Sequence, residues 1–309
     1  MASKILLDCD PGLDDALALL LAHGDPALEL VGVTTVGGNV GLRHTTKNAL
    51  ELREYLGFTD VPISAGADKP LVRETKNAAH VHGESGLGDL VLPPAKLTVT
   101  GTHAADFIVE TIRAAPGSID LVATGPLTNI ALALGKDPGI ARLVKSFVIM
   151  GGSCTRGNAT PAAEFNIYAD PEAARVVFDA DWQVVMVGLD LTLQSQATAR
   201  VIERMTDLGR LGTELIVPLA TFWVDKNDPD WGGQVVHDVC AVAYVARPDL
   251  FASRPARVEV ETTGTFTIGM TVVDFDSPEP NALVPVSLDV EGFWAHVEYV
   301  YGLVAAARA

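Results

Sequence analysis

The chain has 309 residues, of which 48% are hydrophobic and 20% are charged, a composition that supports a sizeable buried core. Its 39 acidic and 22 basic residues give a net charge of −17, which argues against a nucleic acid or an anionic membrane as partner. No apolar run reaches membrane-spanning length without a break.

The cysteines and the start of the chain bear on the cellular compartment. Cys9, Cys154 and Cys240 are odd in number, widely spaced and set in apolar stretches, as is typical of reduced thiols. The first residues lack the regions of a signal peptide, because Asp8 and Asp10 interrupt the only candidate. We therefore expect a cytoplasmic protein.

Four acids stand together near the start, between a predicted strand at residues 4–7 and a predicted apolar helix at residues 16–22. They are Asp8, Asp10, Asp14 and Asp15. Such close carboxylates can all stay ionised only if a cation or a helix N-terminus offsets their charge. Asp14 or Asp15 could simply cap the helix. Asp10, however, follows the carboxyl end of a strand, where α/β folds bind ligands, so a metal site is favoured.

Strands and helices then alternate along the chain. Further strands are predicted at residues 28–36, 61–65, 119–123, 146–150 and 184–187. Helices are predicted at residues 45–56, 104–114, from 130, from 171, 239–246 and 293–307. Residues 68–96 form a long loop, and residues 257–263 and 265–275 form a hairpin around Gly264. This order predicts one α/β domain over residues 1–309, with a mostly parallel sheet flanked by helices on both faces.

Polar residues follow the predicted strands at their carboxyl ends, which share one edge of a parallel sheet. The residues expected at that crevice are Asp10, Asp14, Asp15, Asn39, Thr124 and Met150. Oxygen ligands dominate, and no cysteine or histidine cluster has zinc spacing. A bound ion should therefore be hard, Ca²⁺ or Mg²⁺, and it would lower the pKa of a bound water.

Two histidines are candidates for contact with a ligand. Asp238 precedes an apolar helix and could close the metal site from the far side, and His237 beside it is favoured as a general acid. The alternative for His237 is a loop histidine with one structural hydrogen bond. For His82, in a glycine-rich stretch, substrate contact and a mobile surface loop stay equally open.

An acid and two amides follow the strand that ends at Met150. Asn158, Glu164 and Asn166 suit a hydroxyl-rich ligand such as a sugar. They could equally be caps and turn residues.

These motifs together resemble a known family. The stretch Asp8-Cys9-Asp10-Pro11-Gly12-Leu13-Asp14-Asp15-Ala16 is similar to the N-terminal signature of the nucleoside hydrolases, the inosine–uridine-preferring N-ribohydrolases. The resemblance continues over nearly the whole chain, through Gly37-Gly38-Asn39, His82-Gly83-Glu84-Ser85-Gly86, Thr124-Gly125-Pro126-Leu127-Thr128-Asn129, Met150-Gly151-Gly152, Glu164-Phe165-Asn166, His237-Asp238 and Gly269-Met270-Thr271-Val272-Val273-Asp274.

The resemblance implies the nucleoside hydrolase fold, a single α/β domain with a Rossmann-like core in a mixed, mostly parallel sheet. It also implies a ribonucleoside substrate, a homodimer or homotetramer, and a role for each site residue. Ca²⁺ would be held by Asp10, Asp15, Asp238 and the carbonyl of Thr124. Asp10 would take a proton from the attacking water, and His237 would protonate the leaving base. His82 would line the base pocket. The ribose would be held by Asp14, Asn39, Asn158, Glu164 and Asn166, with Met150 packed nearby.

Two stretches depart from the family pattern. Residues 225–236 do not follow the aromatic and polar pattern expected there. Trp223 or Trp231 could stack on the base or pack elsewhere, so base preference stays open. Ile268 stands where many members have arginine, which we expect to affect packing or assembly more than catalysis.

Two other functions were weighed against the hydrolase. A phosphatase of the haloacid dehalogenase type also carries Asp-x-Asp after its first strand, but Pro11-Gly12 and the Asp14–Asp15 pair break that pattern. A nucleoside-binding protein without turnover is disfavoured by the presence of Asp10 and His237.

Overall fold

The computed structural model describes residues 2–222 and 233–308. Within them, nine strands form one sheet in the order β10-β9-β11-β6-β5-β4-β1-β2-β3. The strands of this sheet are β1 (Ser3–Cys9), β2 (Leu28–Thr35), β3 (Ile63–Ala65), β4 (Ile119–Ala123), β5 (Ser146–Met150), β6 (Val184–Val187), β9 (Phe251–Val260), β10 (Thr271–Asp274) and β11 (Ala282–Leu288). Only the pairings that involve β9 are antiparallel in this sheet. The mixed, mostly parallel sheet is therefore confirmed.

The strand order changes direction beside β1. From β1 the chain runs outward through β2 to β3, and it then returns to place β4 on the other side of β1. Neighbouring connections therefore diverge from the carboxyl ends of β1 and β4, which creates a crevice there. The residues that follow these two strands, Asp10 and Thr124, meet at this crevice.

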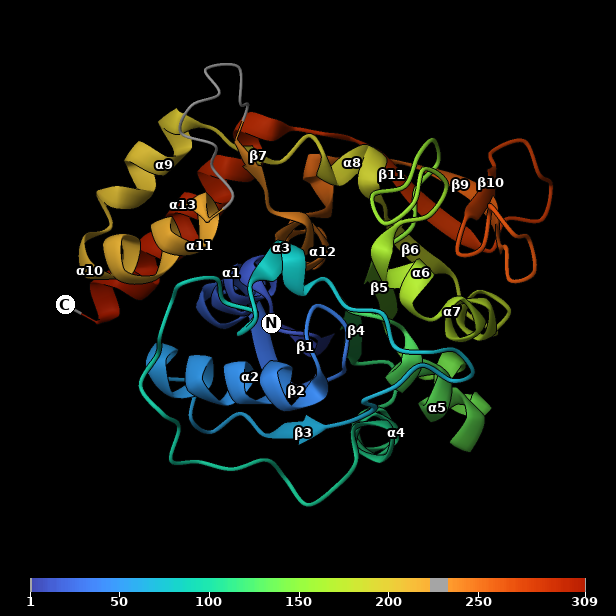
Figure 1. The fold of residues 1–309 in the computed structure, drawn as a ribbon, viewed down its shortest axis with the longest axis horizontal. Helices are drawn as coiled ribbons and strands as arrows, with labels where there is room; N and C mark the ends of the chain where they lie inside the picture. The colour runs from blue at the N-terminus through green and yellow to red at the C-terminus, as the bar shows by residue number, and fades with distance from the viewer. Residues whose placement is uncertain (1, 223–232, 309) are drawn as a thin grey trace.

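Helices cover both faces of the sheet. They are α1 (Leu13–Gly24), α2 (Leu42–Leu56), α3 (Ala79–His82), α4 (Ala104–Ala114), α5 (Thr128–Lys136), α6 (Phe165–Ala169), α7 (Pro171–Phe178), α8 (Leu189–Thr192), α9 (Ala199–Thr206), α10 (Gly209–Leu211), α11 (Val217–Thr221), α12 (His237–Ala246) and α13 (Val290–Ala307). Figure 1 shows α9, α11 and α13 gathered at one end of the molecule, and β9 and β10 at the other.

Each face of the sheet has its own apolar core, because side chains alternate along a strand. Ile5 and Leu7 of β1 pack in the core shared with α1, α2, α12 and α13. Leu6 points the other way, into the core shared with α4, α5 and α7. Helix α1 is buried from Leu13 to Ala22 and, after Asp14 and Asp15 in its first turn, is apolar on all sides, as expected for a helix inside the protein.

Several elements differ from the sequence prediction. Helix α1 begins at Leu13 and α12 at His237, so Asp14, Asp15 and Asp238 lie within first helical turns. Residues 68–96 contain a short helix, α3, that ends at His82. The hairpin is formed by β9 and β10, and its connection spans residues 261–270. In this connection the Glu261 carboxylate accepts the backbone N–H groups of Thr263 and Gly264, which form a local turn instead of strand pairing.

Strand β11 and the helices between residues 189 and 222 were not predicted. Strand β11 carries Pro285, which usually argues against a strand, and a shift in register follows it opposite β9. The two-stranded sheet of β7 (Gln196–Ala197) and β8 (Gln234–Val235) was also missed. Among the residues described, none of the helices combines the length and the apolar character needed to cross a bilayer.

Candidate active site

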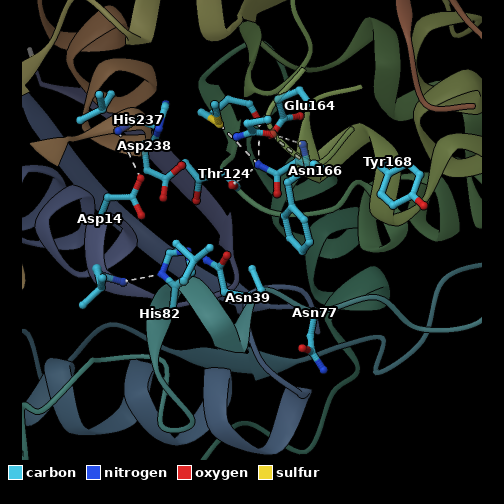
Figure 2. Close-up of a pocket in the computed structure, with 18 of the residues that line it drawn as sticks. Asp14, Asn39, Asn77, His82, Thr124, Glu164, Asn166, Tyr168, His237 and Asp238 are labelled. Carbon is cyan, nitrogen blue, oxygen red and sulfur yellow. Dashed lines mark hydrogen bonds between the residues drawn. The ribbon is translucent and has the colours of Figure 1, made fainter. Parts of the chain in front are cut away.

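A cavity of about 590 Å³ opens at the carboxyl ends of β1, β4 and β5. Figure 2 shows the polar side chains that line it, which come from the segments after β2, β4 and β5, from α3 and α6, and from the first turns of α1 and α12. Ten of the residues expected at the site line the cavity: Asp14, Asn39, His82, Thr124, Met150, Asn158, Glu164, Asn166, His237 and Asp238. The other two, Asp10 and Asp15, are fully buried beside it.

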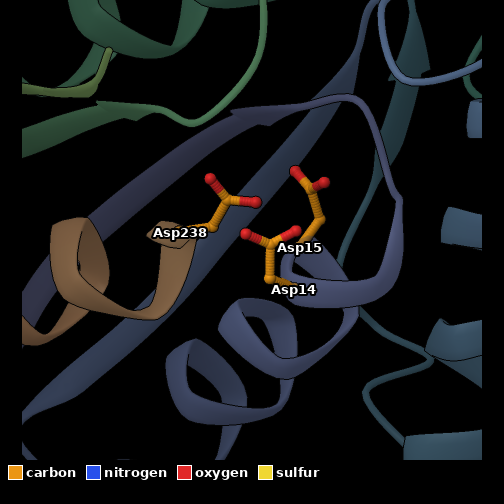
Figure 3. A group of neighbouring side chains, drawn as sticks. All are labelled: Asp14, Asp15 and Asp238. Carbon is orange, nitrogen blue, oxygen red and sulfur yellow. The ribbon is translucent and has the colours of Figure 1, made fainter. Parts of the chain in front are cut away.

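Three carboxylates meet at one end of the cavity (Figure 3). Asp14, Asp15 and Asp238 each offer an oxygen, and these oxygens lie within 4.8 Å of one another. Asp14 and Asp15 stand in the first turn of α1, and Asp238 stands in the first turn of α12. The positive ends of two helix dipoles therefore converge on the same acidic group, which favours its ionised form.

Asp15 is both a helix cap and part of this group. Its Oδ2 accepts the backbone N–H of Gly12 at 3.0 Å and the Nδ2–H of Asn39 at 3.0 Å. Its Oδ1 accepts the hydroxyl of Thr124 at 2.9 Å. Burial, followed by the nearby Asp14, raises the pKa of Asp15 to about 6. The capping and metal-site interpretations of this residue are therefore compatible.

Asp10 lies in a narrow slot between two glycines. Its Oδ2 accepts the backbone N–H of Asn39 at 2.6 Å, while Oδ1 is buried and has no hydrogen-bond partner among the described residues. A Cβ on Gly38 would lie 2.1 Å from Oδ2, and a Cβ on Gly125 would lie 2.6 Å from Oδ1. Glycine at both positions thus allows the main chain to approach this carboxylate closely, because a side chain there would clash with it.

The buried acids of the site raise one another's pKa, because the negative charge on one disfavours ionisation of the next. Burial, and then the neighbouring Asp15, raises the pKa of Asp10, and burial followed by Asp14 raises that of Asp238. An unpaired buried carboxylate oxygen carries a large desolvation cost. A hard divalent cation would relieve both penalties, so the donor set of this pocket fits such an ion.

His237 and His82 face each other across Asp14 (Figure 2). The backbone N–H of His237 donates to Asp14 Oδ2 at 3.2 Å, and its Nδ1 lies 2.7 Å from the hydroxyl of Thr192. The backbone N–H of Leu13 donates to His82 Nδ1 at 3.1 Å, so neutral His82 carries its proton on Nε2. Burial lowers the pKa of both imidazoles.

On the opposite wall of the cavity, Glu164 both caps a helix and lines the cavity. Glu164 caps α6 by accepting the backbone N–H groups of Asn166 and Ile167, and it also accepts that of Gly152 at 2.9 Å. Burial raises the pKa of Glu164 to about 7. Asn166 Nδ2 donates to the carbonyl of Thr124 at 2.7 Å. These polar groups are fixed before any ligand arrives, which suits recognition of hydroxyls.

Asn158 and Asn39 also make contacts within the protein. Asn158 Oδ1 accepts the backbone N–H of Phe165 at 2.9 Å. Asn39 Nδ2 donates to Asp15 and to the carbonyl of Asp10, so this amide supports the acids as well as lining the cavity.

Some residues at the site were not predicted from the sequence. Lys76, Asn77 and Tyr168 line the cavity, and Thr192 contacts His237. Thr192 follows a strand that ends at Val187, so the strand-end criterion used for Thr124 could have indicated it. Of the residues named for base recognition, Trp223 and Trp231 lie outside the described residues. Ile268 lines a second cavity, together with Phe266 and Arg73.

The fold and site define a class of α/β protein with buried acids at the switch point of its sheet, below a cavity lined with amides and imidazoles. The family model for inosine-uridine preferring nucleoside hydrolases matches residues 5–295. The chain is 46% identical over 304 residues to an inosine-uridine preferring nucleoside hydrolase from Leishmania major, with 96% of each chain covered. It is 42% identical over 299 residues to a pyrimidine-specific ribonucleoside hydrolase from Citrobacter koseri, covering 95% of this chain and 96% of that one.

A solved structure is similar over the same length. The purine-preferring ribonucleoside hydrolase from Gardnerella vaginalis superposes with a TM-score of 0.92 at 32% identity, covering 98% of this chain and 99% of that one. The chain therefore belongs to the inosine-uridine preferring nucleoside hydrolase family. It is an N-ribohydrolase, which cleaves the N-glycosidic bond of ribonucleosides to give ribose and a free base. This assignment favours the hydrolase over the phosphatase alternative.

Proposed function

We propose that residues 1–309 form one catalytic domain that hydrolyses ribonucleosides with the help of Ca²⁺. The observation that carries the proposal is the group of buried carboxylates at the foot of the cavity, with the unpartnered Oδ1 of Asp10 beside it. Asp10, Asp15, Asp238 and the carbonyl of Thr124 would hold the ion. Asp14 lies close enough to Asp15 and Asp238 to take part as well.

The residues of the site divide the reaction between them. A bound Ca²⁺ would orient the ribose hydroxyls and lower the pKa of a water. Asp10 takes the proton of the attacking water. The buried carboxylates stabilise the positive charge that grows on the sugar ring as the N-glycosidic bond breaks. His237 delivers a proton to the leaving base, a role that contributes about 10²–10⁴-fold in comparable enzymes.

The cavity wall holds the ribose and the base. Asp14, Asn39, Asn158, Glu164 and Asn166 grip the ribose hydroxyls, with Met150 packed beside the sugar. Hydrogen bonds that already fix Glu164 and Asn166 support this role, because little ordering is then needed on binding. His82 presents its Nε2–H to the base, since its Nδ1 is occupied by the backbone of Leu13.

A reducing-sugar assay across purine and pyrimidine ribonucleosides tests the proposal. We expect release of free ribose and base from at least one class, and the ranking gives the base preference. Release of phosphate from nucleotides without cleavage of nucleosides would contradict the proposal. Saturable binding of inosine and uridine with no ribose released over hours would contradict it as well.

We further propose a cytoplasmic homodimer or homotetramer. The three cysteines, Cys9, Cys154 and Cys240, are all free thiols, which supports a reducing compartment. The family resemblance supports the assembly, which light scattering on the purified protein would measure directly.

A further inference from the structure

The hydroxyl of Thr192 is buried against the imidazole of His237. Thr192 is the last residue of α8, which follows β6 at the same edge of the sheet that carries the cavity. Its side chain is fully buried, and its Oγ1 lies 2.7 Å from Nδ1 of His237. Among the described residues, this hydroxyl has no other hydrogen-bond partner. The contact joins residues 45 positions apart in the chain.

A fixed Nδ1 determines where the other ring nitrogen lies. The two nitrogens of imidazole stand on different sides of the ring, so Nε2 of His237 is turned away from Thr192, and His237 lines the cavity. A hydroxyl can donate and accept, so Thr192 can keep this contact in either protonation state of the ring. An aliphatic side chain of the same shape could do neither.

The main chain around His237 is held by other contacts. Ser195 Oγ lies 2.7 Å from the carbonyl of Thr192 and 3.3 Å from that of Val236, the residue before His237. The backbone N–H of Val236 donates to the carbonyl of Ser195. Loss of the Thr192 hydroxyl would thus leave α8 attached to the start of α12. Only the orientation of the His237 ring would lose support.

We propose that Thr192 is a positioning residue that holds His237 with Nε2 directed at the leaving base, an inference that rests on the proposed acid role of His237. As the N-glycosidic bond breaks, its electron pair passes to the base nitrogen, which takes the proton from Nε2. The imidazole is left neutral with its proton on Nδ1, and that N–H donates to Oγ1 of Thr192. Thr192 itself gains and loses no proton.

Two substrates separate this role from a structural one. Natural nucleosides need protonation of a poor leaving group, whereas a riboside with an activated phenol leaves without it. For Thr192→Val, we expect kcat on inosine or uridine to fall by about tenfold to a hundredfold with little change in KM. Turnover of the 4-nitrophenyl riboside should stay near the wild-type value. Thr192→Ser, which keeps the hydroxyl, should restore nucleoside turnover.

Control variants keep the test decisive. Thr206→Val removes a hydroxyl that donates to the carbonyl of Ile202 on the exposed side of α9. This variant should turn over both substrates at the wild-type rate. If Thr192→Val does not fold, Thr192→Ser and Thr192→Ala form a second pair that differs only in the hydroxyl. Equal loss on both substrates, or no loss on nucleosides, would overturn the role of Thr192.

His237→Ala distinguishes failure of this inference from failure of the proposed function. If His237→Ala slows nucleosides far more than the phenolic riboside but Thr192→Val does not, only the inference about Thr192 fails. If His237→Ala slows both substrates equally, the acid role of His237 fails, and the inference about Thr192 is overturned with it.

Discussion

At the scale of single residues, the site depends on how closely the main chain approaches Asp10. Gly125 follows Thr124 directly, so the segment that places the Thr124 carbonyl also forms one wall of the Asp10 slot. Gly38 forms the other wall and precedes Asn39, whose N–H holds Asp10 Oδ2. The two glycines are therefore as much part of the site as the acids.

Gly125→Ala should lower kcat by about a hundredfold, because its Cβ would displace the Asp10 carboxylate and small misplacements of catalytic groups are costly. Steady-state kinetics with the best nucleoside would measure the loss. Gly135→Ala is the matched control, since nothing lies within 4 Å of a Cβ there, and its activity should not change. A Gly125→Ala enzyme with wild-type kcat would contradict this account of the slot.

At the scale of elements, the site is built from helix starts and strand ends. The first turns of α1 and α12 supply three acids, and the end of β4 supplies Thr124.

Asp170 joins three segments of the chain. It caps α7 by accepting the N–H of Ala173, and it also accepts the Thr128 hydroxyl and the N–H of Leu71.

Asp170→Ala should lower the free energy of unfolding by about 2–4 kcal/mol, because it removes a cap and leaves buried donors without an acceptor. Asp289→Ala is the comparison: Asp289 caps α13 at an exposed position by accepting the N–H of Gly292. Its loss should cost only about 1 kcal/mol. Urea unfolding of both variants would measure the difference, and equal costs would show that the buried contacts of Asp170 add nothing.

Elements with strong local signals were predicted with correct bounds. Strands β4, β5 and β6 and helix α4 match the predicted residues, because their apolar patterns end at clear turn or polar residues. The starts of α1 and α12 were placed too late, since Asp14 and His237 look like loop residues when only the apolar pattern is followed. Strand β11 was hidden by Pro285, which the shift in its pairing with β9 accommodates.

The members of the site could be predicted better than their arrangement. Strand-end position correctly placed Asp10 and Thr124 at this edge of the sheet, because parallel strands bring their carboxyl ends to one edge. No local pattern indicates that Asp14 approaches Asp238, more than 220 residues away in the chain, or that Thr192 meets His237. Such contacts depend on how α8 and α12 pack on the finished sheet.

At the scale of the whole molecule, the strand order creates the site. Because the chain leaves β1 in one direction and returns to β4 on its other side, a crevice forms where the first and fourth strands end. The acids that gather there raise one another's pKa while buried, so the fold carries an electrostatic penalty at its centre. We expect a divalent cation to offset this penalty and to stabilise the folded chain when bound.

Calcium titration of the chelator-treated enzyme tests this claim most directly, with heat of binding and ribose release followed on the same samples. We expect about one Ca²⁺ to bind per chain, with ribose release returning in proportion to the ion bound. The Asp15→Asn and Asp238→Asn variants should show neither heat of calcium binding nor ribose release. Full activity of the metal-free enzyme, or unchanged calcium binding by these two variants, would contradict the account.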